Sequence, residues 1–439
     1  MLPDDILALL SHMESHGIKG YVVGGAVRDL VMGREPDDYD IAAECLPEDL
    51  LEAFSDHQHY DTSIRFGTLN VYSGKRWIEI TCCRYESGYS DLRHPDTVEF
   101  CKDIKKDLKR RDFTVNAMAM GSKGQIVDPF GGREDIKNKI IRCVGEPERR
   151  FSEDALRIIR ALRFASCLEF EIEENTKRAI REKRELLSLV AGERIFAELC
   201  KLLLGDGVLS VLLEYSSELG VIIPELLPCV GLDQKNPYHI YTVYEHIARS
   251  VAASPKEKNI RLCMLFHDIE KPRAFFVDEK GVGHFYGHPE MSQETAENIL
   301  RRLKADADTV KKVSFLVKYH DTRPSATKKS LHKYLMKVGF EGARELLSVR
   351  RADLSAQSPE FFSQFEYLSE SERIIDELEK EGVCLSVQDL LVNGNDLIEL
   401  GIEKGKKIGE VLYWLLGMVV AGQVKNEREQ LLSLARRKV

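Results

Sequence analysis

One stretch near the start of the chain, residues 18–42, constrains the fold and the chemistry more than any other. Its sequence is IKGYVVGGAVRDLVMGREPDDYDIA. An apolar, β-branched run ends at two glycines and a helical pattern follows, which predicts a strand, a turn and a helix. Gly24 and Gly25 leave backbone N–H groups bare of side chains, which suits a phosphate group. In the strand predicted next, Asp38 and Asp40 are two residues apart and therefore project from the same face.

Two carboxylates on one face of a strand repel each other, and burying them without a partner is costly. A divalent cation removes this conflict, and Mg²⁺ prefers carboxylate and phosphate oxygens as ligands. The alternative is a solvated acidic turn, because Asp37 and Asp38 lie in a run typical of turns. The order of strand, glycine turn, helix and strand favours a site for a metal-bound nucleoside triphosphate.

Residues 64–81 alternate between apolar and polar side chains, which predicts a β-hairpin that turns at residues 73–75. Glu79 lies between two isoleucines in this pattern and faces away from them, so it is a candidate third carboxylate for the metal. A solvent-exposed strand glutamate is the alternative. Residues 84–97 are rich in Gly, Ser, Asp and Pro and are predicted to form a mobile loop.

A basic stretch follows within residues 107–120, DLKRRDFTVNAMAM. Arg110 and Arg111 place cations beside the predicted phosphate site. Asn116 is four residues after Asp112, so the two side chains share a face if the segment is helical.

Residues 152–165, SEDALRIIRALRFA, predict a helix with Ser152 as its N-cap. Asp154 and Arg157 are three residues apart and share a face of that helix. A carboxylate only accepts hydrogen bonds, and a guanidinium only donates them. Cytosine and adenine each present an amino donor beside a ring-nitrogen acceptor, whereas uracil and guanine do not match this order. The pair is therefore a candidate protein template for C and A, with plain helix capping as the alternative.

Together these segments resemble the polymerase β-like nucleotidyltransferases, and more closely the class II tRNA nucleotidyltransferases, which include CCA-adding enzymes and bacterial poly(A) polymerases. The matching motifs are GGAVRD…DYDIA, RRDFTVNA, the DPFGG turn at 128–132, EDALR, and GERIFAEL at 192–199. The resemblance implies that Asp38 and Asp40 are catalytic and hold Mg²⁺. It further implies substrate binding by Gly24, Gly25, Arg28, Asp29, Arg110, Arg111, Asp112, Asn116, Glu153, Asp154, Arg157 and Arg160.

The GERIFAEL helix is expected to shape the surroundings of the nucleotide, with Glu193, Arg194 and Glu198 as ion-pair partners. A purely structural role is the alternative. Near the C-terminus, residues 393–415 resemble a segment that ends many CCA-adding enzymes. Glycines and lysines at 404–409 within it are expected to meet an RNA phosphate backbone.

The second half of the chain carries histidines and aspartates on separate predicted helices, a ligand set typical of transition metals. Their order resembles the HD phosphohydrolase domain. The matching positions are His246, His267, Asp268 and Asp353. The resemblance implies a second divalent transition metal there, and His288 and His320 lie between these positions in the sequence. The HD pattern usually has glycine where this chain has Glu270, so an HD fold is expected and hydrolysis is left open.

Composition is consistent with several packed domains, because the chain has 439 residues, 43% of them hydrophobic and 31% charged. A net charge of −9 argues against a protein that coats nucleic acid over its whole surface, but it permits a local basic groove. The ten cysteines are scattered without a C-x-x-C pair, which predicts buried thiols in a reducing cytosol. No apolar run approaches the length of a membrane span.

The expected fold class is an α+β, polymerase β-like head followed by an all-α neck, body and tail. The expected domains are a catalytic head at 1–140, a nucleotide-selecting neck at 141–220, an HD domain at 221–355 and a tRNA-binding tail at 356–439. The expected function is template-independent addition of C, C and A to the 3′ end of tRNA from CTP and ATP, with release of pyrophosphate. A cytoplasmic monomer or homodimer with no membrane partner is expected.

Three alternatives remain open. A bacterial poly(A) polymerase, or an enzyme that adds only CC or only A, would share the head motifs. The poly(A) type usually carries a strongly basic tail, and in the resembled family a loop at 84–97 is needed to add the final A. An HD-type metal-dependent phosphohydrolase and a non-catalytic RNA-binding protein are less consistent with intact Asp38 and Asp40.

Overall fold

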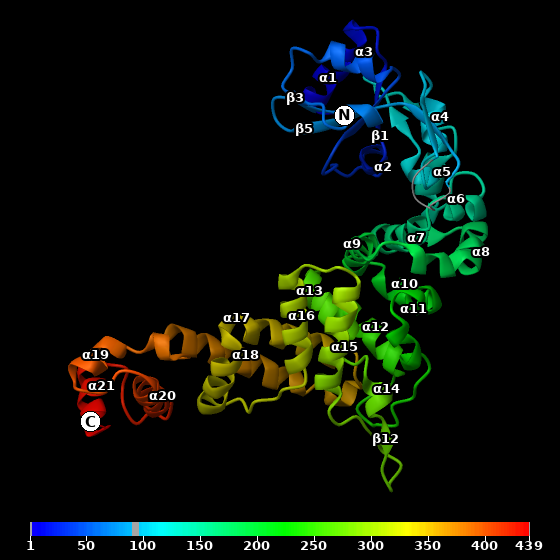
Figure 1. Cartoon of the computed structure of the whole chain (residues 1–439). Coiled ribbons are helices and arrows are strands. Elements are labelled where there is room, and N and C mark those ends of the chain that lie inside the picture. Colours follow the sequence, from blue (N-terminus) through cyan, green and yellow to red (C-terminus); the bar gives the residue numbers. More distant parts are fainter. Residues whose placement is uncertain (1, 90–95, 439) are drawn as a thin grey trace. The chain divides into compact units, whose positions relative to one another are not determined.

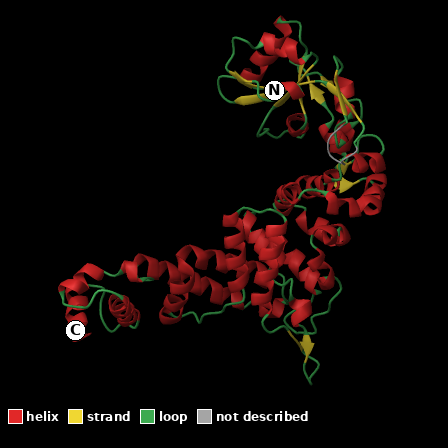
Figure 2. Cartoon of the chain, viewed as in Figure 1, coloured by secondary structure: helices red, strands yellow, loops and turns green. Residues whose placement is uncertain are grey.

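The structure is a computed structural model that describes residues 2–89 and 96–438. The chain divides into two compact units, Met1–Leu227 with Arg302–Lys304 and Pro228–Arg301 with Ala305–Val439. The first unit contains the main β-sheet, and the second is almost entirely helical (Figures 1 and 2). The expected α+β head followed by helical segments is thus confirmed. Among the described residues, we find no helix whose length and apolar character would let it span a bilayer.

A seven-stranded sheet forms the head, with the strand order β3-β4-β5-β2-β1-β8-β9. The β2 and β5 strands are parallel, and the other neighbouring pairs are antiparallel. The strands are β1 Gly20–Val23, β2 Asp40–Ala43, β3 His59–Tyr60, β4 Thr68–Tyr72, β5 Trp77–Cys82, β8 Ala119–Met120 and β9 Ile126–Val127. The predicted hairpin is β4–β5, and the two strands predicted within residues 18–42 lie side by side in this sheet.

Helices alternate with the strands along the sequence of the head. They are α1 Asp4–Ser15, α2 Gly25–Val31, α3 Pro47–Ala53, α4 Ile104–Lys109 and α5 Gly132–Lys137. The α1 helix buries Ile6, Leu10 and Met13, because its apolar residues recur at helical spacing. The α2 helix ends shortly before Gly33, whose φ of 73° suits the turn toward β2.

The segment 84–97 is not a loop throughout, so that prediction is wrong at both ends. Arg84–Ser87 (β6) pairs antiparallel with Thr97–Phe100 (β7). Most of the Gly, Ser, Asp and Pro residues that suggested a loop lie between these strands in the sequence. Along β6 and β7 themselves, polar and apolar side chains mostly alternate, as is typical of strands. The part of the prediction that falls on 90–95 lies outside the described residues.

The helix predicted at 152–165 is two helices, α6 Pro147–Glu153 and α7 Leu156–Leu168, separated at Asp154 with φ −145° and ψ 104°. Ser152 is therefore not an N-cap: it lies inside α6, and its Oγ donates to the Glu148 carbonyl at 2.8 Å. The α6 helix starts before Ser152 because Pro147 favours the first turn of a helix. The rest of the first unit contains α8 Glu174–Lys183, α9 Gly192–Leu203, α10 Val208–Glu214, α11 Ser216–Ile222 and the parallel pair β10 Ile140–Ile141 with β11 Glu171–Ile172.

The second unit is a helical assembly with one short hairpin. Its elements are α12 Val243–Ala253, α13 Lys258–Phe266, α14 Lys271–Ala274, β12 Phe276–Val277, β13 Gly283–His284, α15 His288–Arg302, α16 Ala307–Tyr319, α17 Lys328–Ser355, α18 Gln364–Lys380, α19 Gly394–Glu399, α20 Lys406–Val420 and α21 Arg428–Ala435. The α17 helix is kinked at Gly339, which has a φ of 70°. The last three helices pack around their own apolar cluster, which includes Leu397, Leu415 and Leu431.

Candidate active site

Three carboxylates, those of Asp38, Asp40 and Glu79, lie near one another where β2 and β5 run parallel. Asp40 is the register partner of Glu79. β2 begins at Asp40, so Asp38 and Tyr39 precede the strand that was predicted to contain them; the expected alternation is still present, since Tyr39 is 5% exposed and the aspartates on either side of it are exposed. Partial desolvation raises the pKa of Asp40, and the charges of Asp38 and Glu79 raise it further against the opposing effect of Arg111. Negative charge is therefore concentrated where a divalent cation would relieve repulsion, and the all-oxygen donor set fits Mg²⁺.

A cavity of about 470 Å³ opens at the two aspartates. Its lining consists of Gly24, Gly25, Arg28, Asp38, Asp40, Arg110, Arg111, Asp112, Asn116, Asp154, Leu156, Arg157, Arg160, Arg163, Phe164 and Arg194. Seven of these are arginines and four are aspartates, so the lining carries excess positive charge of the kind that binds phosphates. Both predicted catalytic residues and ten of the twelve predicted substrate-binding residues line this one cavity.

The other two predicted residues stand behind arginines of the cavity. Asp29 accepts hydrogen bonds from Nε and Nη2 of Arg28, both at 2.9 Å. Arg28 also donates through Nη1 to the Asn116 side-chain oxygen at 2.9 Å. Glu153 accepts from Nη1 of Arg157 at 3.0 Å. Asp29 and Glu153 therefore orient the guanidinium groups and do not line the cavity themselves.

Asp112 and Asn116 were predicted to share a face if their segment were helical, but the segment is not an α-helix. A 3-10 turn spans Thr114–Asn116, and it still lets Asn116 Nδ2 donate to Asp112 Oδ1 at 3.3 Å. Asp112 Oδ2 accepts from Arg160 Nε at 2.9 Å. Burial alone would raise the pKa of Asp112, but the Arg160 guanidinium outweighs it and lowers the pKa to about 2. Asp112 thus ties α7 to the head as a carboxylate.

Asp154 and Arg157 both line the cavity, and each is held by other residues. Asp154 Oδ1 accepts from the Leu156 backbone N–H at 3.1 Å, and this hydrogen bond at the start of α7 is the contact expected of a helix-capping residue. Asp154 Oδ2 also accepts from Arg194 Nη2 at 2.9 Å. Arg157 donates through Nη2 to the Arg110 carbonyl at 3.2 Å. Capping and base selection are compatible here, and base selection stays a prediction.

Sequence reasoning did not place Arg163, Phe164 and Arg194 in the cavity. The Arg163 guanidinium lies 3.7 Å from the Phe164 ring centroid, and its Nε is 2.8 Å from Glu198 Oε2. Arginines recur every three residues on α7, at 157, 160 and 163, and this spacing could have indicated one cationic face. As predicted, Arg194 and Glu198 take part in ion pairs, Arg194 with Asp154 and Glu198 with Arg160 and Arg163. For Glu193, no ion pair is found among the described residues.

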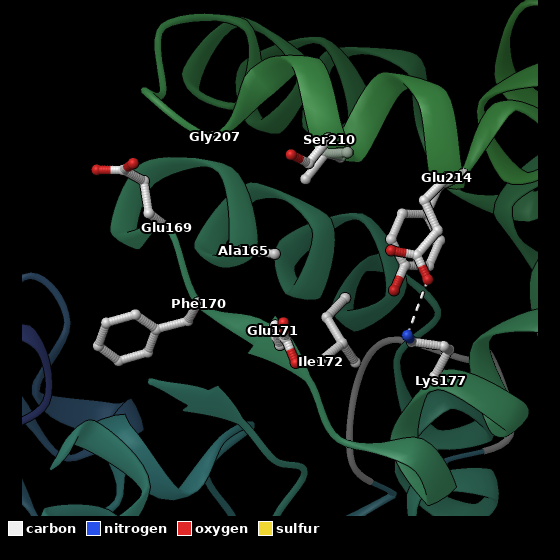
Figure 3. A pocket seen from close by; sticks show the side chains of 11 residues that line it. Ala165, Glu169, Phe170, Glu171, Ile172, Lys177, Gly207, Ser210 and Glu214 are labelled. Atoms are coloured by element: carbon white, nitrogen blue, oxygen red, sulfur yellow. Dashed lines mark ion pairs between the residues drawn. The ribbon is translucent and has the colours of Figure 1, made fainter. Parts of the chain in front are cut away.

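A separate pocket of about 430 Å³ lies in the neck (Figure 3). It is lined by residues of α7, β11, α8 and α10, and Lys177 forms an ion pair with Glu214 at 2.8 Å across it. None of the predicted site residues lines this pocket.

The second predicted site also gathers its members. In the second unit, His246 Nε2 lies 3.0 Å from Asp353 Oδ1, and His267 Nε2 lies 3.2 Å from Asp268 Oδ2. His288 and His320 join the same cluster.

Three family models match the chain. They are described as "Poly A polymerase head domain" at residues 20–142, "Probable RNA and SrmB- binding site of polymerase A" at 169–226, and "tRNA nucleotidyltransferase domain 2 putative" at 284–435. None of these descriptions names an HD domain, so that interpretation stays a prediction. The sheet, the paired aspartates and the head-domain match define a nucleotidyltransferase of the poly(A) polymerase type.

Relatives among known proteins specify the family. The chain is 32% identical to a CCA-adding enzyme of Geobacillus sp. over 429 residues, which cover 97% of this chain and 94% of the relative. The chain therefore belongs to the CCA-adding enzyme family. With the CCA-adding enzyme of Lactobacillus helveticus it is 49% identical over 207 residues, 46% of this chain and 51% of that protein, so this match spans about half of the relative's length.

Solved structures agree with this family. The Bacillus stearothermophilus CCA-adding enzyme in complex with CTP has 30% identity and a TM-score of 0.76, covering 100% of this chain and 98% of that chain. The Thermotoga maritima CCA-adding enzyme complexed with tRNA shares the fold, with a TM-score of 0.58 at 23% identity, covering 100% of this chain and 96% of that chain.

Proposed function

We propose that this protein adds C, C and A to the 3′ end of tRNA, using CTP and ATP and releasing pyrophosphate. One observation carries the proposal: a single cavity joins the paired carboxylates Asp38 and Asp40 at the start of β2, seven arginines, and an aspartate–arginine pair of the composition that matches C and A. Membership of the CCA-adding family and the CTP complex of the Bacillus stearothermophilus relative support the same reaction.

Asp38 and Asp40 would hold Mg²⁺, and Glu79, the register partner of Asp40, would be the third carboxylate of the site. When bound there, Mg²⁺ would supply charge neutralisation for the primer 3′-hydroxyl, the α-phosphate and the departing pyrophosphate. Gly24 and Gly25 leave room for the triphosphate. Binding of its oxygens falls to the cavity arginines, whose acidic partners hold them in place before the nucleotide arrives.

Base selection is assigned to Asp154 and Arg157. An Asp154 oxygen would accept from the amino group that cytosine and adenine share, and Arg157 would donate to the neighbouring ring nitrogen. Arg194 holds the Asp154 carboxylate, and Glu153 holds the Arg157 guanidinium. The two groups that read the base are thus each fixed by a partner of opposite charge.

The division into head, neck, HD-type body and tRNA-binding tail, with borders near residues 140, 220 and 355, belongs to the same proposal. Transfer RNA would be gripped by its shape and backbone, because a polymerase that extends every tRNA cannot depend on base sequence. Ten scattered cysteines without a C-x-x-C pair suit a reducing cytosol as the place of action. Either a monomer or a homodimer is consistent with this function.

The decisive experiment incubates the protein with tRNA transcripts ending before C, after CC and after CCA, each with one labelled triphosphate at a time. The expected result is two C additions to the first transcript, one A addition to the second and none to the third. Repeated A addition would establish a poly(A) polymerase, and incorporation of only C or only A would establish a partial enzyme. No incorporation with any transcript would contradict nucleotidyl transfer altogether.

A further inference from the structure

A cluster of histidines lies where the end of α1 meets the end of α3, and none of its members lines the nucleotide cavity. His12 is in the last turn of α1, and His57 comes shortly after α3. His12 Nε2 lies 2.7 Å from the backbone oxygen of Ala53, the last residue of α3, although the two residues are 41 apart in the sequence. The cluster therefore joins two helices through contacts that the sequence analysis did not predict.

Three imidazole rings pack against one another in this cluster. The centroid of the His12 ring lies 4.3 Å from that of His57 and 4.5 Å from that of His16. The fully buried Phe54 supports two of the rings, with its ring centroid 5.0 Å from His12 and 5.2 Å from His57. Protonated rings at this spacing would repel one another, whereas neutral imidazoles can share a cation through their ring nitrogens.

A hydrogen bond determines which nitrogen of His12 is available. A carbonyl oxygen can only accept, so the Nε2 atom that contacts Ala53 carries the proton. Nδ1 of the neutral ring then presents a lone pair. The same contact orients the ring, in the way that a backbone carbonyl orients metal-binding histidines. His12 thus has the hydrogen-bonding pattern of a metal ligand.

A carboxylate supplies negative charge beside the second imidazole. Asp56 Oδ1 lies 2.8 Å from His57 Nδ1. This hydrogen bond lowers the pKa of Asp56, so the group remains ionised. One ligand atom from each of His12, Asp56 and His57 lies within 4.8 Å of the other two. Two ligands of one ion with bonds of ~2.1 Å are at most about 4.2 Å apart, so side-chain movements of less than about 1 Å would close the three atoms around an ion.

We propose that His12, Asp56 and His57 form a site for one divalent transition-metal ion, which clamps the end of α1 to the end of α3. Two imidazoles and one carboxylate favour Zn²⁺, Co²⁺, Ni²⁺ or Cu²⁺, whereas the all-oxygen donors of Asp38 and Asp40 favour Mg²⁺. Three protein ligands leave the remaining coordination positions to water. The head would thus bind two kinds of metal at two separate places.

The clamp would stabilise a helix that packs against the first strand of the sheet. Gly20 of β1 lies so close to α1 that a Cβ atom on it would be 2.8 Å from side-chain atoms of Leu10 and Met13. The β1 strand leads directly into the turn at Gly24. An ion that binds only the folded head raises its stability by mass action. We therefore expect the ion to affect the stability of the head and not the chemistry in the cavity.

The first test compares bound metal between variants. The full-length chain is stripped with EDTA and dialysed to equilibrium against Zn²⁺ or Ni²⁺, and the ions per chain are counted at saturation by elemental analysis. Ions held elsewhere in the chain add equally to every variant, so the difference from the wild type is the decisive quantity. We expect His12→Gln and His57→Gln each to bind one ion fewer. The glutamine of His12→Gln can still donate to the Ala53 oxygen, which preserves the contact between the helices.

His284→Gln is the matched control, because His284 also pairs with an aspartate, its Nε2 lying 2.9 Å from Asp278 Oδ2. That pair belongs to no group of three potential ligands among the described residues, so the variant should bind as many ions as the wild type. Asp56→Asn should bind the ion with an affinity lower by about tenfold or more. An unchanged count in His57→Gln would overturn the proposal. An equal loss in His284→Gln would also overturn it, because it would mean unspecific binding at surface histidines.

The second test locates the ion by residue. Diethyl pyrocarbonate modifies histidine nitrogens that carry a free lone pair, and mass spectrometry of peptides measures the modification with and without Zn²⁺. We expect the modification of His12 and His57 to fall by the fraction of sites occupied, and that of His284 to stay the same. In His57→Gln, the protection of His12 should be lost.

Equal modification of His12 with and without Zn²⁺ in the wild type would overturn the assignment. A melting curve in EDTA checks that each variant folds. If His12→Gln does not fold, the modification pattern of the wild type and the metal count of His57→Gln still decide.

Discussion

The Asp154 carboxylate is held by the guanidinium of Arg194, with Oδ2 accepting from Nη2 at 2.9 Å and Oδ1 from Nη1 at 3.3 Å. Asp154 stands at the break between α6 and α7, and Arg194 comes from α9. A side chain that is to read a base, as proposed for Asp154, must keep its direction, and this two-point contact helps to fix it. The contact leads to the first prediction.

Arg194→Lys keeps the charge but loses the planar fork, so the Asp154 carboxylate gains freedom to turn. We expect the preference of CTP and ATP over UTP in kcat/KM to fall by about tenfold, which corresponds to about 1.4 kcal/mol. In a double-mutant cycle with Asp154→Ala, the two effects should be strongly non-additive. Additive effects would mean that Arg194 acts on the nucleotide by a route independent of Asp154.

The second prediction separates capping from base selection at Asp154. Asp154→Asn retains an oxygen that can accept from the Leu156 N–H, whereas Asp154→Ala does not. The alanine variant should lose about 1 kcal/mol of stability, and the asparagine variant less. Both should lose kcat/KM for CTP and ATP, with selectivity over UTP and GTP reduced by about one to two orders of magnitude. Unaltered selectivity in both, measured beside a melting curve, would reduce Asp154 to a helix cap.

The third prediction concerns the carboxylates of the head. Asp38→Ala or Asp40→Ala should abolish incorporation of CTP and ATP alike, while tRNA affinity in a filter-binding assay stays within about twofold, because RNA would be held elsewhere. Normal turnover in either variant would remove the head from the reaction.

A variant of the third carboxylate, Glu79, is expected to have a smaller effect at the same site. Glu79→Gln should raise the Mg²⁺ concentration needed for half-maximal rate by several-fold, because one negative charge beside Asp40 is lost. Glu99→Gln, an exposed strand glutamate in β7, is the matched control and should leave the Mg²⁺ dependence unchanged. An equal Mg²⁺ dependence in Glu79→Gln and the wild type would exclude Glu79 from the site.

The fourth prediction compares two glycines with nearly the same positive φ. Gly24 and Gly33 have φ values of 72° and 73°, so an alanine is strained at either position. A methyl group on Gly24 would lie 3.2 Å from Nη1 of Arg111, whereas at Gly33 it would meet nothing within 4 Å. Gly24→Ala should therefore raise KM for CTP and ATP, and Gly33→Ala should not. Equal KM values in the two variants would exclude a role of this turn in binding the triphosphate.

The fifth prediction follows from the buried pair of Asp112 and Arg160. The lowered pKa of Asp112, about 2, stabilises the fold above about pH 4, and this contribution is lost as pH falls toward 2. In Arg160→Met, burial without the guanidinium raises the pKa of Asp112, so the variant loses stability as pH rises through about 4. Denaturant unfolding should show a deficit that grows between pH 4 and pH 7 to roughly 3 kcal/mol.

Arg178→Met, at an exposed arginine on α8, is the control and should show a small deficit that does not depend on pH. A deficit in Arg160→Met that is constant across the same range would mean that Asp112 is neutral in the folded protein.

The sequence was sufficient to predict those structural features that depend on residues close together in the chain. The strand, glycine turn, helix and strand of residues 18–42 and the β4–β5 hairpin follow from local patterns, and most of the cavity lining could be found from motifs. The break at Asp154 could not, because SEDALRIIRALRFA has unbroken helical spacing. The extended backbone of Asp154 is accompanied by its contact with Arg194, forty residues away in the sequence. The place of Arg194 in the cavity likewise depends on a tertiary neighbour, its ion-pair partner Asp154.

The parallel register of β2 and β5 determines how the proposed metal site forms during folding. Asp40 pairs with Glu79, and Ile41 pairs with Ile80, so the same alignment that buries the isoleucines sets the carboxylates together on the opposite face. Slipping one strand by a single residue would expose its apolar side chains and scatter the acids. A chain that folds with these isoleucines buried therefore also places Asp40 beside Glu79, two of the proposed metal ligands, without a separate assembly step.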